Sequence, residues 1–246
     1  MTEIELSADA NAHRYRGRLI KMGAELTERE GEHSVEYQLR LLYSTPPAPY
    51  EDRDDHDETQ VEDKSPWGVV AQEIALADLI GAEIEIKYLG EIRCVSCGAK
   101  TRKAYGDGHC YPCFMDSPHT AECVIRPALC RAHEGGGRDP EWEQRNHNQP
   151  HYVYLALSSK YKVGVTRDWP QRWVDQGAAA IQLIAITPYR QLAGEIEIAL
   201  SEYYSDRTSW QRMLKGEVLE DADLEGEVKR ARSLLKPELQ LSLIHI

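Results

Sequence analysis

The chain has 246 residues, a hydrophobic content of 41% and a mean hydropathy of −0.56. This length allows one or two domains with a buried core, and the absence of any apolar run near the roughly 18 residues of a membrane helix excludes an integral membrane protein. The first ten residues lack a basic segment followed by an apolar one. We therefore expect no secretory signal and a cytoplasmic location.

The net charge of −12 argues against a nucleic-acid partner, because phosphates attract basic surfaces. The charge is unevenly distributed, however. Residues 51–64 contain eight acidic and two basic residues, which accounts for half of the net charge, whereas residues 151–190 contain five basic and two acidic residues. The composition therefore leaves open a phosphate-facing surface in the C-terminal part of the chain.

Residues 1–90 are predicted to form a β-rich part of the fold. The expected strands are 15–22, 35–43 and 82–89. Residues 70–80 are predicted as a short helix that leads back into the sheet. Residues 45–66 combine prolines with the acidic run, a composition that buries little apolar area, so we expect a solvated loop there.

All six cysteines lie between residues 94 and 130, which in a reducing compartment favours metal binding over disulfides. Two Cys-x-x-Cys knuckles, formed by Cys94, Cys97, Cys110 and Cys113, are separated by twelve residues. Each knuckle can present two sulfurs to one ion, and two knuckles complete a tetrahedral shell. The alternatives are a redox pair or ordinary buried thiols, but a redox motif needs only one such pair. The spacing predicts a structural zinc ion in a zinc-ribbon or treble-clef-like module at 91–135.

A second group of possible ligands follows the knuckles. Cys123, Cys130 and His133 offer three ligands for a second zinc ion. The histidines that could supply a fourth ligand are His109, His119 and His147. Two small buried thiols with a surface histidine explain the same residues equally well, so both interpretations stay open at this point.

Residues 136–150 are rich in Gly, Pro and polar residues and are predicted to be a linker to a second unit at 151–240. The expected elements of that unit are strands at 151–157 and 161–166, a helix at 171–176, a strand at 181–186, and helices at 191–204 and 221–235. Asp168 is the expected N-cap of the first helix and Gly177 its end. The first two strands would bury Val and Leu on one face and place Tyr, Lys and Thr around Gly164 on the other.

The last six residues, LSLIHI at 241–246, read as a translated sequencing adaptor. We expect them to carry no information about the fold, and the natural chain to continue differently after Gln240.

The order strand, strand, helix, strand, helix resembles the GIY-YIG nuclease superfamily over about residues 151–210. The matching residues are Tyr152-Val153-Tyr154, Lys162-Val163-Gly164 and Arg172. The segments HYVYLAL, KVGVTR and RWVDQGA and the paired knuckles also resemble an uncharacterised prokaryotic family, domain of unknown function 2797, over most of the chain. The expected fold class is α+β, with a β-rich N-terminal part, a zinc module and a GIY-YIG-like β-β-α-β-α domain.

The nuclease resemblance implies roles for four residues. Tyr154 would be the general base or its hydrogen-bonding partner, Lys162 takes the place of the second tyrosine, and Arg172 would stabilise charge on the scissile phosphate. Glu197 would hold magnesium or manganese, and the residues that follow it favour it over Glu195. Each residue also has an ordinary interpretation as a strand tyrosine, a surface cation or a solvated helix residue.

The sequence therefore predicts a divalent-metal-dependent nuclease that acts on DNA or RNA and contains a structural zinc module. No membrane and no organic cofactor are expected. One alternative is a zinc-containing protein that binds nucleic acid without cleaving it. The other is a structural or interaction protein without nucleic acid, which the net charge favours.

Overall fold

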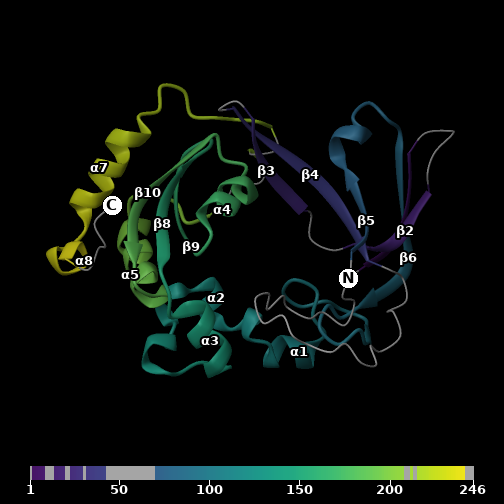
Figure 1. Cartoon of the computed structure of the whole chain (residues 1–246), viewed down its shortest axis with the longest axis horizontal. Helices are drawn as coiled ribbons and strands as arrows, with labels where there is room; N and C mark the ends of the chain where they lie inside the picture. The colour runs from purple at the N-terminus through teal and green to yellow at the C-terminus, as the bar shows by residue number, and fades with distance from the viewer. Residues whose placement is uncertain are drawn as a thin grey trace. The chain divides into compact units, whose positions relative to one another are not determined.

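The computed structural model describes residues 2–8, 14–19, 23–29, 32–42, 70–207, 211–212 and 215–241. The chain divides into two compact units, Met1–Asp116 and Ser117–Ile246, which we describe separately (Figure 1). The expected acidic loop at 45–66 and residues 242–246 of the expected adaptor tail lie outside the described residues. Within the described part of the chain, no helix has both the length and the apolar character needed to cross a bilayer.

The N-terminal unit contains an antiparallel sheet, in agreement with the predicted β-rich part. Its strands are β1 (Thr2–Ala8), β2 (Arg14–Leu19), β3 (Gly23–Arg29), β4 (Glu32–Leu42), β5 (Val70–Ala75), β6 (Ile84–Arg93) and β7 (Lys100–Thr101). The strand order is β3-β4-β2-β1-β6-β7, and β5 pairs with β4. A helix, α1 (Tyr111–Asp116), ends this unit.

The predicted helix at 70–80 is wrong. Residues 70–75 form β5, and a single 3₁₀ turn, η1 (Leu76–Leu79), follows. The reason is long-range pairing: Ile74 lies opposite Leu39 of β4 and is buried in the small core of this sheet together with Leu41. Pairing with a neighbouring strand therefore overrides a local pattern that suits a helix equally well.

The C-terminal unit contains a three-stranded antiparallel sheet with the order β10-β8-β9. Its strands are β8 (His151–Leu157), β9 (Tyr161–Thr166) and β10 (Ala180–Thr187). The helices that follow the first strands of this sheet are α4 (Trp169–Gln176), α5 (Arg190–Ser201), α7 (Leu224–Leu234) and the short α8 (Pro237–Leu241). The element order expected from the sequence is thus observed, with boundaries shifted by a few residues.

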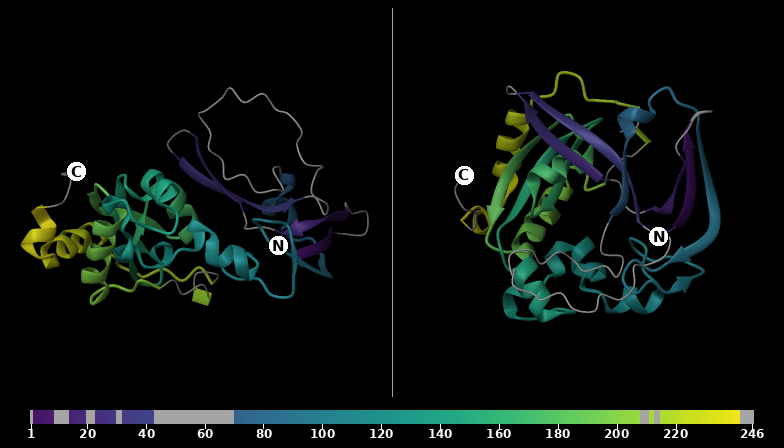
Figure 2. Two further views of the ribbon diagram at one scale, coloured as in Figure 1. Left: turned by 90° about the horizontal axis from the view of Figure 1, so that it is seen from below. Right: turned by 45° about the vertical axis from the view of Figure 1, so that its right-hand side comes forward.

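The two faces of this sheet have different partners. Val153, Leu155 and Val163 are fully buried and form one core with apolar residues of α5 and α7. Tyr154 alternates with them and therefore lies on the other face, where Arg172 of α4 contacts it. Accordingly, α4 and α5 flank the sheet on opposite sides in Figure 1, and α7, in yellow, lies beside β10 there and in Figure 2.

The start of the C-terminal unit consists of short helical turns. They are η2 (Pro118–Thr120), α2 (Glu122–Ile125), η3 (Pro127–Leu129), η4 (Ala132–Glu134) and α3 (Pro140–His147). Residues 136–150, predicted as a linker, contain α3. The Asp139 carboxylate caps this helix by accepting a hydrogen bond from Trp142 N at 3.0 Å, and Pro140 stands in its first turn. Its inner face is polar rather than apolar, so hydrophobic periodicity gave no signal for it.

Candidate functional site

The two cysteine knuckles converge. The Sγ atoms of Cys94, Cys97, Cys110 and Cys113 all lie within 4.8 Å of one another, and Cys97 Sγ and Cys110 Sγ are 3.7 Å apart. Two sulfurs bound to one tetrahedral zinc ion at about 2.3 Å would be about 3.8 Å apart. The spacing of the thiols therefore fits a four-sulfur zinc site.

Backbone hydrogen bonds shape the first knuckle. The N–H groups of Gly98 and Ser96 donate to the carbonyl oxygen and to Sγ of Cys94, at 3.1 and 3.4 Å, and Gly98 has a φ of 71° that favours glycine. Although burial alone would raise the pKa of the Cys94 thiol, the backbone N–H groups around it lower that pKa to about 6. A thiolate that can bind a metal thus forms readily at this position.

A four-sulfur shell leaves no open position on the ion. Zinc held here would cross-link the turn that follows β6 to the turn that precedes α1. The group suggests a structural zinc-binding site, and it offers no place for a substrate.

The second group of cysteines has one of the expected histidines as a neighbour, His147, but not His133. Among the described residues, the ligand atoms that lie within 4.8 Å of one another come from Cys123, Cys130, Glu143 and His147. His133 does not belong to this group; its ring stacks on Tyr189, with ring centroids 4.5 Å apart. The grouping of Cys123 and Cys130 with His133 is therefore corrected. Glu143 and His147, both on the inner face of α3, reach the two cysteines instead.

The polar face of the C-terminal sheet centres on Tyr154. This side chain is completely buried, and its hydroxyl oxygen accepts a hydrogen bond from Nε of Arg172 at 3.1 Å. The ring lies over Gly164 of β9, where a Cβ atom would be 2.6 Å from Tyr154 Cζ. Glycine is therefore required at position 164, because any side chain there would displace the tyrosine.

Lys162 lies on the same face of the sheet, with 9% of its surface exposed. Burial, together with the positive charge of Arg172, lowers its pKa to about 8, although Glu197 and Asp206 act in the opposite direction. Burial and the charge of Asp206 raise the pKa of Glu197, against the effect of nearby cations. Burial also raises the pKa of Tyr154.

These charge interactions relate the four residues singled out by the nuclease resemblance. Tyr154, Lys162, Arg172 and Glu197 each interact electrostatically with at least two of the others. Arg172 and Glu197 are partly accessible to solvent, whereas Tyr154 and Lys162 are buried. The arrangement can hold an anion against two cations, with a carboxylate beside them.

Two acidic residues of these groups were missed by the sequence analysis. Asp206 follows α5 and interacts with Lys162 and Glu197; no local pattern distinguishes it. Glu143 precedes His147 by four residues on α3, a spacing that places both on one face of a helix. That signal was present in the sequence, but the segment was predicted as a linker.

No curated protein and no solved structure is significantly similar to this chain. A protein-family model described as "Protein of unknown function (DUF2797)" matches residues 81–243, which include both cysteine groups and the whole C-terminal sheet. Because this match covers well over half of the sequence, the chain belongs to the DUF2797 family.

Proposed function

We propose that the C-terminal unit is a phosphodiester hydrolase that acts on nucleic acid and uses a divalent cation. The observation that carries this proposal is that the buried Tyr154 is hydrogen-bonded to Arg172, and that Lys162 and Glu197 lie within electrostatic range of that arginine. The earlier resemblance to GIY-YIG nucleases supports the same reaction class. The knuckle zinc has a structural role in this proposal.

Arg172 is the residue that binds the phosphate. Its guanidinium is planar and offers several N–H donors, of which Nε is already bonded to Tyr154. The remaining N–H groups suit two oxygens of one phosphate group. Lys162 adds a second positive charge within electrostatic range of Arg172, which favours an anion at this place and stabilises negative charge that develops during hydrolysis.

Tyr154 acts as a positioning residue. It is 0% exposed, and burial raises its pKa above the usual value. Both facts disfavour a phenolate general base and favour a fixed hydrogen-bonding partner that orients Arg172. Of the two roles that the resemblance implied for Tyr154, the supporting role fits this geometry better.

Glu197 is the residue proposed to hold magnesium or manganese. Magnesium needs only one or two protein carboxylates, because water and substrate phosphate complete its shell, and Asp206 is a second carboxylate within electrostatic range. The bound ion would act as a Lewis acid on the phosphate. The contribution of the chain is to hold this negative charge beside the two cations, so that phosphate and metal bind together.

The experiment is a cleavage assay with the purified full chain, supplied with Mg²⁺ or Mn²⁺, on supercoiled plasmid, single-stranded DNA and single-stranded RNA. We expect Arg172→Met and Glu197→Gln to lower kcat by about 100-fold or more. Tyr154→Phe removes one hydrogen bond to a charged group and should lower kcat by about 10-fold. Glu195→Gln is the matched control, because Glu195 is exposed on the same helix.

If the wild-type protein cleaves none of these substrates, the proposal of hydrolysis fails. Binding then distinguishes the remaining functions. A binding module without catalysis should show an affinity for nucleic acid that falls with salt. In Arg172→Met, the slope of log affinity against log salt concentration should be smaller by about one unit. Absence of any salt-dependent binding leaves a structural or interaction role.

A further inference from the structure

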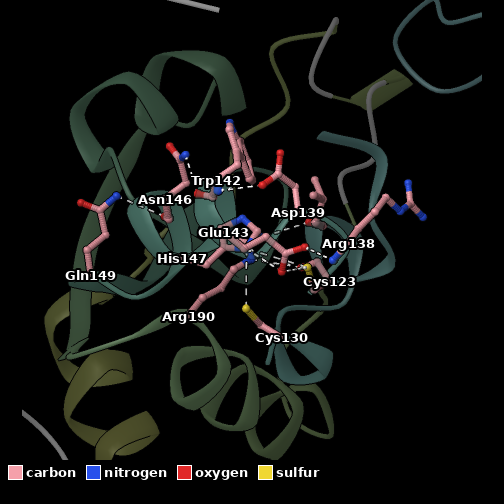
Figure 3. A network of polar contacts seen from close by, with 11 residues as sticks. Cys123, Cys130, Arg138, Asp139, Trp142, Glu143, Asn146, His147, Gln149 and Arg190 are labelled. Atoms are coloured by element: carbon pink, nitrogen blue, oxygen red, sulfur yellow. Dashed lines mark hydrogen bonds and ion pairs between the residues drawn. The ribbon is translucent and has the colours of Figure 1, made fainter. Parts of the chain in front are cut away.

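Four buried side chains, of types that bind metal ions in proteins, meet in the first part of the C-terminal unit (Figure 3). Cys123 lies in α2, Cys130 directly follows η3, and Glu143 and His147 lie in α3. Each has at most 6% of its surface exposed. We propose that these four residues bind a second zinc ion, through two sulfurs, one carboxylate oxygen and Nδ1 of the histidine.

The distances between the ligand atoms fit one ion. His147 Nδ1 lies 3.8 Å from Cys123 Sγ and 3.6 Å from Cys130 Sγ. Glu143 Oε2 lies 3.7 Å from Cys123 Sγ and 3.7 Å from His147 Nδ1. In a tetrahedral zinc site with ordinary bond lengths, neighbouring ligand atoms are about 3.3–3.8 Å apart. In Figure 3 the four side chains point toward one common position.

The burial of Glu143 supports a cation at that position. Its carboxylate is 1% exposed, and a buried carboxylate is unfavourable unless a cation and hydrogen bonds compensate it. Oε1 accepts a hydrogen bond from Arg138 N at 2.7 Å. Among the described residues, the ion-pair partner of Oε2 is His147 itself. A zinc ion would balance the carboxylate and both thiolates at once.

The backbone around Glu143 is built to leave room for its carboxylate. Gly137 has a φ of 140°, and a Cβ atom there would lie 2.6 Å from Glu143 Oε1. Only glycine is relaxed in this conformation, and only glycine leaves this space open. Gly137 and Arg138 N thus position the carboxylate from outside the ligand set, as supporting groups do in known metal sites.

This site has a structural consequence for α5. Arg190, the first residue of α5, donates hydrogen bonds to the carbonyl oxygens of Cys123 and Val124 at 3.0 and 2.9 Å. The segment between the two cysteines also packs directly against α5. An ion that fixes this segment to α3 therefore also stabilises the position of α5. The inference does not depend on the proposed hydrolase activity.

Zinc content of the full chain tests the site. We expect two zinc ions per wild-type chain, and one in each of the variants Cys97→Ser/Cys110→Ser and Cys130→Ala/His147→Ala. X-ray absorption of the wild-type protein should give about three sulfurs and one nitrogen or oxygen per zinc, the mean of a four-sulfur and a two-sulfur site. A single zinc per chain with four sulfurs would overturn the proposal, and this measurement does not require any variant to fold.

Two glycines in one loop provide a matched pair of variants. Gly137→Ala should displace Glu143 and weaken the affinity of one zinc ion by about 10–100-fold. Gly135 also has a positive φ, of 75°, but a Cβ atom there meets nothing within 4 Å. Gly135→Ala introduces a positive-φ alanine in the same loop, in the less strained left-handed region, and should leave zinc affinity within about threefold. Equal zinc affinities for the two variants would show that Glu143 does not bind the metal.

Glu143→Gln keeps the shape of the side chain and removes its charge. We expect weaker binding of one zinc ion. When Co²⁺ replaces zinc, the substitution should change the visible spectrum of the site formed by Cys123, Cys130, Glu143 and His147. The spectrum of the four-sulfur site should stay the same. An unchanged Co²⁺ spectrum in this variant contradicts the assignment of Glu143 as a ligand.

Discussion

Gly194 in the middle of α5 allows a direct test of how the cysteine-bearing segment packs. In an isolated helix, replacing glycine by alanine stabilises the helical state by about 1 kcal/mol. In this structure, a Cβ atom at Gly194 would meet backbone atoms of the segment at Pro127 and Ala128, among them Pro127 C at 2.5 Å and Ala128 Cα at 2.8 Å. Helix propensity therefore predicts that Gly194→Ala raises the free energy of unfolding, whereas tertiary packing predicts that it lowers it.

The magnitude follows from the displacement that the new methyl group requires. An ordinary contact begins at about 3.4 Å, so the backbone of η3 would have to move by roughly 1 Å. Overpacking of this kind costs about 1–3 kcal/mol, and the upper end applies because backbone cannot rotate away as a side chain can. After subtraction of the helix-propensity gain, we expect Gly194→Ala to lower the free energy of unfolding by about 1–2 kcal/mol.

Urea unfolding followed by tryptophan fluorescence measures this change, because Trp142, Trp169 and Trp173 all lie in the C-terminal unit. The corresponding fall in Tm is roughly 3–8 °C. Glu195→Ala, at the exposed neighbouring position, should stay within about 0.5 kcal/mol of wild type. A Gly194→Ala protein as stable as wild type, or more stable, would refute the packing of α5 against η3.

Three further predictions concern charge and metal. Affinity for a labelled oligonucleotide, measured by fluorescence anisotropy, should fall as pH rises through about 8, because the lowered pKa makes Lys162 lose its charge there. The affinity of the Lys162→Met variant should not change across this pH range. A wild-type affinity that does not change with pH contradicts this prediction. Hydrogen bonds from Arg93 and Arg18 lower the pKa of Glu91 to about 2, so its contribution to stability is complete above about pH 4.5 and is lost as pH falls toward 2. Glu91→Gln should therefore lower the free energy of unfolding of the N-terminal unit by about 1–3 kcal/mol at pH 7, and a difference from wild type that does not shrink in acid disproves this. Cys97→Ser should release one zinc ion and make residues 94–113 sensitive to limited proteolysis; unchanged zinc content is the opposing result.

The C-terminal sheet was predictable because its signals are local. Alternation of apolar and polar residues marks β8 and β9 in sequence windows of six or seven residues. Local signals also define both ends of α4. The Asp168 carboxylate caps its start by accepting a hydrogen bond from Gln171 N at 3.2 Å, and Gly177, with a φ of 55°, ends it. Each of these signals acts within a few residues along the chain.

The errors share one physical cause, which is that the deciding partner lies far away in sequence. Residues 70–75 became a strand because they pair with residues 38–42 of β4. His147, and not His133, lies beside Cys123 and Cys130, because the fold turns the inner face of α3 toward both cysteines. His133 stacks on Tyr189 instead. Spacing named His147 as one of three candidate fourth ligands, but it could not choose among them or exclude His133.

The sequence by itself determined which four cysteines come together in the two knuckles and the order of elements in the C-terminal unit, because spacing and periodicity act over a few residues. Only the tertiary structure decided which acidic residues join Lys162 and Glu197, and which side chains complete the group around Cys123 and Cys130. Charges and ligands separated by many residues meet only when packing brings their helices and strands together, and that packing depends on the whole unit.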